Sequence, residues 1–177
     1  MMTGPGNLLL SFGANPRADS PDLTNGAVSA IEQFIVDTLK LLKYNGAAVF
    51  KTVDNWKWQI GADARGIEAF GKYSPFAFVA YEPPSSEREG DYALKQVLRF
   101  AVTIGIECKT AGVARVGDAT HLGASKIRDL VIAALDGSHP GDSVACDCLY
   151  YQNEAELVSS ANRHAIDMFF QANFITN

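Results

Sequence analysis

The sequence predicts an α+β domain with a mostly antiparallel sheet of about five strands and two main helices on one face. Two segments, 28–43 and 119–135, carry apolar residues at spacings of three and four, as amphipathic helices do. Several other segments alternate in polarity or are continuously apolar over strand lengths. These strands follow one another through short connections, which favours antiparallel pairing and leaves the second face of the sheet open.

Composition places the chain among folded globular proteins. Its 177 residues are close to the usual size of one domain, and 47% of them are hydrophobic while 20% are charged. The formal net charge of -5 argues against a general nucleic-acid binder, because neutralising phosphates takes clustered Lys and Arg. We therefore expect no sequence-specific nucleic-acid partner.

Signals for membrane insertion or secretion are missing from the sequence. The longest apolar runs are far short of the roughly 18 residues that cross a bilayer, and the early NLLLSFGA lacks a basic flank. The three cysteines, Cys108, Cys146 and Cys148, are odd in number and have no framework spacing, which indicates reduced thiols in a cytosolic context. We expect an intracellular protein with no membrane partner.

Residues 1–25 differ from the rest in being rich in Gly, Pro, Asn, Asp and Ser. They form either a solvated leader or an arm that orders against a neighbouring subunit. Three consecutive leucines, at 8–10, are unusual in a solvated segment, so Leu9 and Phe12 are candidate anchors of such an arm. We divide the chain into a flexible N-terminal arm or leader, 1–25, and a single α+β domain, 26–177.

The first helix is expected at 28–43. Six apolar residues share one of its faces: Val28, Ile31, Phe34, Ile35, Leu39 and Leu42. Asn25 is a suitable N-cap, and Asn45-Gly46 provides the C-terminal stop. The helix therefore lays one apolar face on the sheet.

Two strands are expected next, at 47–53 and 76–81, and the second is apolar on both faces and therefore central. The irregular stretch between them includes one helical turn near 67–70. Trp56 and Trp58 lie two residues apart and would share one strand face. They either pack under a loop or form an exposed aromatic pair at an interface, where Trp is enriched.

The segment 82–96 is a polar break that contains Pro83-Pro84 and a cluster of charges. We expect a long mobile hairpin loop here, because two prolines cannot continue a strand ladder. Its carboxylates are expected to be solvated, since nothing near them would desolvate them and shift a pKa.

The clearest strand is 98–108, which alternates along its whole length. Its apolar face carries Leu98, Phe100, Val102, Ile104, Ile106 and Cys108, and its second face carries Arg99, Ala101, Thr103, Gly105, Glu107 and Lys109. The small residues of the second face let another backbone approach closely, and charges of both signs flank them. This face contacts either a neighbouring subunit or ordered arm, or plain solvent.

A Gly-rich connection leads into the second helix, 119–135, which Asp118 or Thr120 caps and Asp136-Gly137 ends. Two further strands, 144–151 and 163–174, close the chain, and a polar connection joins them.

No motif of catalysis or cofactor binding stands out. The sequence has no HExxH, no G-x-S-x-G and no Walker Lys-Ser/Thr. Cys146 and Cys148 would bind zinc only with two further ligands, for which Cys108 and His164 are the candidates, and buried cysteines acting as small hydrophobes are the favoured interpretation. We therefore expect no enzyme, no catalytic residue, no metal and no cofactor.

Three segments carry a resemblance to a known family. They are the helix VSAIEQFIVDTLKLL, the strand-loop-helix segment RFAVTIGIECKTAGVARVGDATHLGASKIRDLVIAALDG, and the tail VACDCLYYQNEAELVSSANRHAIDMFFQANF. Together they resemble the minor tail proteins of tailed bacteriophages, and most of all the Mu-like prophage tail family near the tail-terminator (tail-completion) proteins. The resemblance covers about 28–175 and is one of pattern and element order. The leader of 1–25 departs from the compact start of that family.

The resemblance implies a small α+β subunit that closes into a homo-oligomeric ring, typically of six, at the head-proximal end of the tail tube. Such a ring stops tube polymerisation and contacts the tail tube and the head-connector proteins. It needs no cofactor and catalyses nothing. The implied location is the virion tail, after assembly in the bacterial host cytoplasm.

A ring needs heterologous contacts that close on themselves. The residues expected at such subunit interfaces are Arg99, Thr103, Glu107 and Lys109 on the strand face, Arg115 in the following loop, Glu87 and Arg88 in the long loop, and Leu9 and Phe12 in the arm. Two alternatives stay open: a dimeric α+β module of the bacterial cytoplasm that binds a small molecule or peptide on its open sheet face, and a thiol or metal enzyme built on Cys146 and Cys148.

Overall fold

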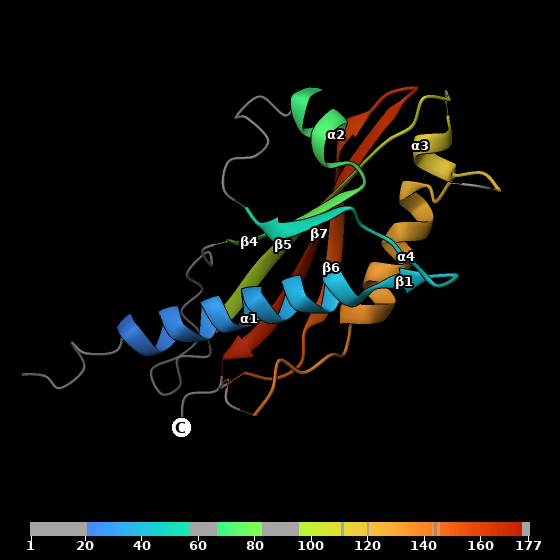
Figure 1. Ribbon diagram of the computed structural model, residues 1–177. Helices are drawn as coiled ribbons and strands as arrows, with labels where there is room; N and C mark the ends of the chain where they lie inside the picture. Colours follow the sequence, from blue (N-terminus) through green and yellow to red (C-terminus); the bar gives the residue numbers. More distant parts are fainter. Residues whose placement is uncertain are drawn as a thin grey trace, which may run out of the picture.

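A computed structural model describes residues 21–56, 67–82 and 96–174, without 111, 120, 143 and 145. The elements in order are α1 (Pro21–Leu41), β1 (Lys43–Tyr44), β2 (Ala47–Ala48), β3 (Thr52–Asn55), α2 (Ile67–Tyr73), β4 (Phe76–Glu82), β5 (Gln96–Glu107), α3 (Val113–Val116), α4 (Ala124–Leu135), β6 (Tyr150–Ser159) and β7 (Arg163–Phe174). The predicted α+β class with a mostly antiparallel sheet of five strands is confirmed (Figure 1).

The main sheet has the strand order β3-β4-β5-β7-β6, so β3 and β6 are its edges. β5 and β7 pair along their full length, from Gln96↔Phe174 to Glu107↔Arg163. β4 and β6 join them as antiparallel neighbours, whereas β3 and β4 are parallel. Antiparallel pairing of consecutive strands was therefore wrong at this one place, because the segment that contains α2 carries the chain back and lets β4 start beside the start of β3.

The main core lies between the sheet and the helices α1 and α4. The sheet supplies the predicted apolar face of β5, Leu98 to Ile106, and the facing residues of β4 and β7. The helices supply fully buried stripes, which consist of Ile31, Ile35 and Leu39 in α1 and Ile127, Val131 and Leu135 in α4. Figure 1 shows α1 crossing the strands while α4 lies beside β6. Both predicted amphipathic helices thus bury the face that their spacing indicated.

The carboxylate of Glu32 links α1 to the sheet through a hydrogen bond. β3 ends at Asn55, so the outward backbone N–H of Tyr81 in β4 lies beyond the last strand partner on that side. Glu32 of α1 reaches this position, and its Oε1 accepts a hydrogen bond from the Tyr81 N–H at 2.8 Å. Burial raises the pKa of Glu32, and the hydrogen bond from Tyr81 opposes that shift. The helix thereby satisfies a backbone donor that a longer β3 would otherwise pair.

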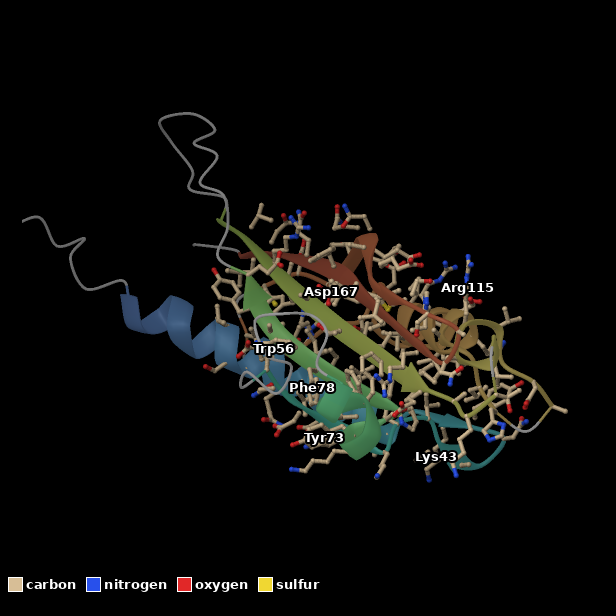
Figure 2. All side chains as sticks on the ribbon, turned by 90° about the horizontal axis from the view of Figure 1, so that it is seen from above. Lys43, Trp56, Tyr73, Phe78, Arg115 and Asp167 are labelled. Carbon is tan, nitrogen blue, oxygen red and sulfur yellow. The ribbon has the colours of Figure 1, made fainter. Side chains whose placement is uncertain are left out.

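A second, smaller cluster covers part of the opposite face of the sheet. Phe70 of α2 packs edge-on against Phe76, with ring centroids 5.4 Å apart, and Phe76 stacks on Phe78 at 4.8 Å. Trp56 and Tyr73 pack edge-on against Phe78, as the grouped labels in Figure 2 show. Trp56 is half-buried, which agrees with the packing interpretation; Trp58 lies outside the described residues.

Gly105 explains why the second face of β5 is so small at this point. A methyl group on Gly105 would lie 2.8 Å from Cε2 of the Phe76 ring and closer still to two other ring carbons. Gly105 and Phe76 are direct register partners on neighbouring strands. The space that we expected another subunit's backbone to use at Gly105 is therefore filled by an aromatic ring of the same chain.

Several element boundaries differ from the sequence predictions. α1 begins at Pro21, so Asn25 lies inside the helix instead of capping it, and the expected boundary between 25 and 26 falls within α1. The expected strand 47–53 is split into β2 and β3 around the buried Val49 and Phe50.

The C-terminal half shows two further differences. α4 begins at Ala124 and not at 119, because the side chain of Asp118 accepts a hydrogen bond from the His121 N–H at 2.7 Å and holds a turn ahead of the helix. The expected strand 144–151 becomes a strand only from Tyr150, and the polar connection after it is the body of β6, Tyr150–Ser159.

Candidate subunit interface

The residues expected at an interface on the second face of β5 have partners within the chain. Glu107 pairs with Arg163, which lies directly across from it on β7. The Oε1 atom of Glu107 is 2.6 Å from NH2 and 2.7 Å from Nε of Arg163, and both side chains are about 30% exposed or less. The backbone N–H of Glu107 also donates to the Ser74 hydroxyl at 2.7 Å. Glu107 is therefore committed to holding β5, β7 and the start of β4 together.

Arg99 lies at the other end of the same face. Its Nε atom is 3.3 Å from Oε2 of Glu82 on β4, and its guanidinium lies 4.3 Å from the ring centroid of Phe169 on β7. The side chains of Arg99 and Glu82 are both more than 40% exposed. An exposed pair of this kind contributes little to folding, so Arg99 retains the freedom to contact another molecule.

Thr103 sits midway along the face and is buried. Its hydroxyl donates a hydrogen bond of 2.5 Å to Oδ1 of Asp167, its register partner on β7. Burial raises the pKa of Asp167, while the Thr103 hydrogen bond acts in the opposite direction. Figure 2 shows Asp167 on the β7 side of the sheet. Thr103 is therefore a structural residue of this face and offers no exposed group to a partner.

The remaining predicted interface residues fall into two groups. Lys109 and Arg115 are exposed. Arg115 was expected in a loop but lies in the short helix α3, and Figure 2 shows it at the far rim of the molecule from Trp56. Leu9, Phe12, Glu87 and Arg88 lie outside the described residues. The structure thus gathers Arg99, Thr103 and Glu107 on one face without Lys109 and Arg115.

The most exposed part of the sheet is one that sequence reasoning missed. β6 is an edge strand, and all of its residues from 152 to 157 are exposed. It carries Glu154 and Glu156 together with the exposed apolar side chain of Leu157. A sequence signal was present, because a polar Ser-Ser-Ala-Asn turn directly precedes β7 and a hairpin partner is expected on its other side.

Among the described residues, only those beside the start of β6 cover its outer side. There the Leu149 N–H donates to the Ser138 carbonyl at 2.8 Å and the Tyr151 N–H donates to Asp136 Oδ1 at 2.9 Å. From 152 to 159, the backbone hydrogen bonds of the described residues run to β7 and the turn that joins the two strands. This stretch is consequently an open strand edge that faces solvent.

Charge on β6 is negative. Arg128 of α4 contacts Glu154 at 3.1 Å and also pairs with Asp129, its neighbour in the chain, at 3.0 Å. Glu156 is half-exposed, and Nε2 of the buried His164 lies 3.9 Å from its carboxylate. Burial is the main cause that lowers the pKa of His164, and the positive charge of Arg115 acts in the same direction, so the imidazole is neutral near pH 7 and adds no positive charge beside Glu156.

Of the three free cysteines, Cys146 has the environment of a core thiol, whereas Cys108 and Cys148 are half-buried. Cys146 is buried, and burial together with the nearby Asp147 raises its pKa to about 11. A thiol of this kind stays protonated at neutral pH and is a poor nucleophile and metal ligand. Within the described residues, no group of three or more His, Cys, Asp and Glu side chains is arranged to hold a metal ion.

Comparison of the sequence with protein-family models finds no match, and comparison with curated proteins finds none either. No helix in the described part of the chain combines the length and the apolar character needed to cross a membrane. The function of this chain is therefore inferred from the surface of the molecule and from the resemblance in element order.

Proposed function

We propose that this chain is a structural tail protein of a bacteriophage or prophage, a ring-forming tail-terminator or minor tail subunit that caps the tail tube and joins it to the head. The observation that carries the proposal is the open edge of β6 from 152 to 159, at one border of the sheet. A ring subunit needs such a surface, because each copy must offer one patch to a neighbour and receive a different one.

Two further observations support the proposal. The α+β architecture agrees with the fold that the resemblance implies, and α1 and α4 bury one face of a sheet whose border strands are β3 and β6. The polar side chains on the second face of β5 serve pairing within the chain, as the contacts of Glu107 and Thr103 show. Residues committed to structure in this way fit an assembly protein better than a catalyst.

The experiment is a tube-capping assay. Purified tail-tube protein of a phage that carries this chain would be allowed to polymerise with and without the chain, and tube lengths would be measured by electron microscopy. The proposal predicts shorter, uniform tubes with the labelled chain at one end. Unchanged tube growth with no bound chain would overturn it, and a closed two-fold dimer under the same conditions would favour the dimeric binding module instead.

A further inference from the structure

The two edges of the sheet have opposite charge. The acidic edge is β6 at 152–159; its exposed Glu154 and Glu156 lie, like their register partners Met168 and Ile166, on the sheet face that α1 and α4 cover. The lysine edge is the β3 border together with the β1–β2 hairpin that precedes it. Five exposed lysines lie there or reach it: Lys40, Lys43, Lys51 and Lys72, and Lys126 from α4, a helix that itself packs on β5, β6 and β7.

Contacts show that these lysines gather at one corner. Lys51 directly precedes β3, and its Nζ donates to the Lys72 carbonyl at the end of α2 at 3.0 Å. Lys126, in the first turn of α4, places its Nζ 5.6 Å from the ring centroid of Tyr44 in β1. Figure 2 shows Lys43 on the same hairpin, at the rim of the molecule. Two acidic residues also belong to this part of the molecule: Asp37, 4.0 Å from Lys40, and Asp54 in β3 itself.

From these edges we infer that copies of this chain join head to tail, with the acidic edge of one copy against the lysine edge of the next. The inference rests on the proposed function in that it names the surfaces by which the ring would form.

Register places the two edges on one line across the sheet. A single row of strand partners runs Thr52, Phe76, Gly105, Ala165, Val158. Lys51 adjoins one end of this row, and Glu156 and Leu157 adjoin the other. Four strand spacings of about 4.8 Å separate the two ends. A second copy displaced along this row brings its Lys51 toward Glu156 of the first.

Apolar residues accompany the charges on both sides. Leu157 is 38% exposed on the acidic edge, and Leu41 at the end of α1 is 76% exposed between Lys40 and Lys43. Large apolar side chains exposed to this extent beside opposite charges are typical of a contact surface. The two edges are therefore complementary in charge and in the presence of an apolar residue.

The same chemistry disfavours a two-fold contact. Antiparallel pairing of β6 with a second β6 would bring Glu154 and Glu156 of one copy opposite those of the other, and like charges directly opposite each other destabilise a pair of strands. Shifts in register at 152 and 157 further interrupt the edge. Pairing of β6 with the β6 strand of a second copy is therefore disfavoured, whereas contact with a basic surface is favoured. A contact between different patches generates a closed ring or an open filament.

The test reverses the charge of each edge separately in the full chain. The acidic-edge variant is E156K/L157K and the lysine-edge variant is K43E/K51E; all four side chains are exposed. Circular dichroism first checks that each variant folds. Analytical ultracentrifugation at about 50 mM salt then measures the concentration at which half of the protein is assembled, since electrostatic contacts are strongest at low ionic strength. K109E, which reverses an exposed lysine outside both edges, is the control for charge reversal elsewhere, and it also tests the strand face on which Lys109 was expected to form an interface.

We expect each edge variant to raise that midpoint concentration about tenfold or more, and high salt to weaken assembly of the unmodified chain. Mixing the two variants restores assembly, because each then meets an edge of opposite charge. K109E leaves the midpoint unchanged.

Three outcomes would overturn the inference. The first is a ring that both edge variants form normally, which would leave the proposed function standing with another contact surface. The second is an equal loss of assembly in K109E, which would show that assembly depends on the net charge of the chain or on the second face of β5. The third is a strictly monomeric unmodified chain that also fails to cap tubes, which would remove the proposed function as well.

Discussion

Replacing Gly105 with alanine tests directly whether the small face of β5 serves packing inside the chain. The added methyl group would overlap three carbons of the Phe76 ring, the farthest of them 2.8 Å away. Phe76 is completely buried, with Phe70 packed edge-on against its ring and Phe78 stacked on it, so the ring cannot move away from an added methyl group without disturbing these contacts.

The magnitude follows from two opposing effects. Alanine is favoured over glycine within a strand by roughly 0.5–1 kcal/mol of backbone entropy. Overpacking a closely packed core costs about 1–3 kcal/mol, and the overlap with an immobile ring places G105A at or above the upper end of that range. We expect the free energy of unfolding to fall by about 2–3 kcal/mol in total.

Urea denaturation of four proteins measures the effect: the unmodified chain, G105A, F76A and the double variant. F76A alone should cost about 3–5 kcal/mol, because it leaves a cavity. In the double variant the methyl group that G105A adds enters that cavity, so the double variant should be no less stable than F76A. A stability of G105A within about 0.5 kcal/mol of the unmodified chain, or simple additivity in the double variant, would show that Phe76 does not occupy the space at Gly105.

Three further predictions concern single contacts. E32A should lose about 1–2 kcal/mol of stability, because it leaves the Tyr81 N–H without its acceptor. E32Q keeps an acceptor oxygen and should be at least as stable as the unmodified chain at pH 7. Equal losses of stability in both variants would refute the role of Glu32 as the acceptor. The pKa of Asp167 is raised in the folded state, so folding favours its protonated form and stability is lost as pH rises through the folded pKa. D167N should remove that loss, which makes it more stable than the unmodified chain at pH 7 and no more stable in acid. Urea denaturation that shows the same difference at both pH values would contradict this prediction. Cys146, whose pKa is about 11, should resist alkylation at pH 7 in the native state and react on unfolding; mass spectrometry after peptide digestion showing rapid native labelling of Cys146 would count against its burial.

The elements that bury one whole face were predictable from sequence. β7 occupies Arg163–Phe174, the full predicted segment, and the apolar face of β5 is in the core as expected. In both strands a period of two is imposed by a helix layer on one side, so the alternation is visible in the residues themselves. The buried stripes of α1 and α4 follow from the same layer.

β6 and the β3–β4 pair were not predictable in this way. β6 is exposed on nearly all of its residues, so it has no strong alternation and its carboxylates look like those of a loop. The parallel pairing of β3 with β4 depends on where the chain returns after α2, which no local pattern encodes.

The residues proposed to form the interface also changed once the strand pairing was known. Sequence placed Arg99, Thr103 and Glu107 on one face, and the structure confirms that placement. The ion pair of Glu107 with Arg163 and the hydrogen bond of Thr103 to Asp167 join residues 56 and 64 positions apart. Such partners become visible only once the register of β5 and β7 is known. The edges, with their opposite charges, became candidates only when the strand order was known.

The mass of the unmodified chain in solution shows whether copies of this chain assemble into a ring. Size-exclusion chromatography with light scattering, run over a wide range of protein concentrations, should show a discrete assembly of more than two copies, with six times the 19.1 kDa subunit mass as the expected value for a ring of the typical size. A mass of one subunit at every concentration, or the mass of a dimer that stays constant as the concentration rises, would contradict assembly into a ring.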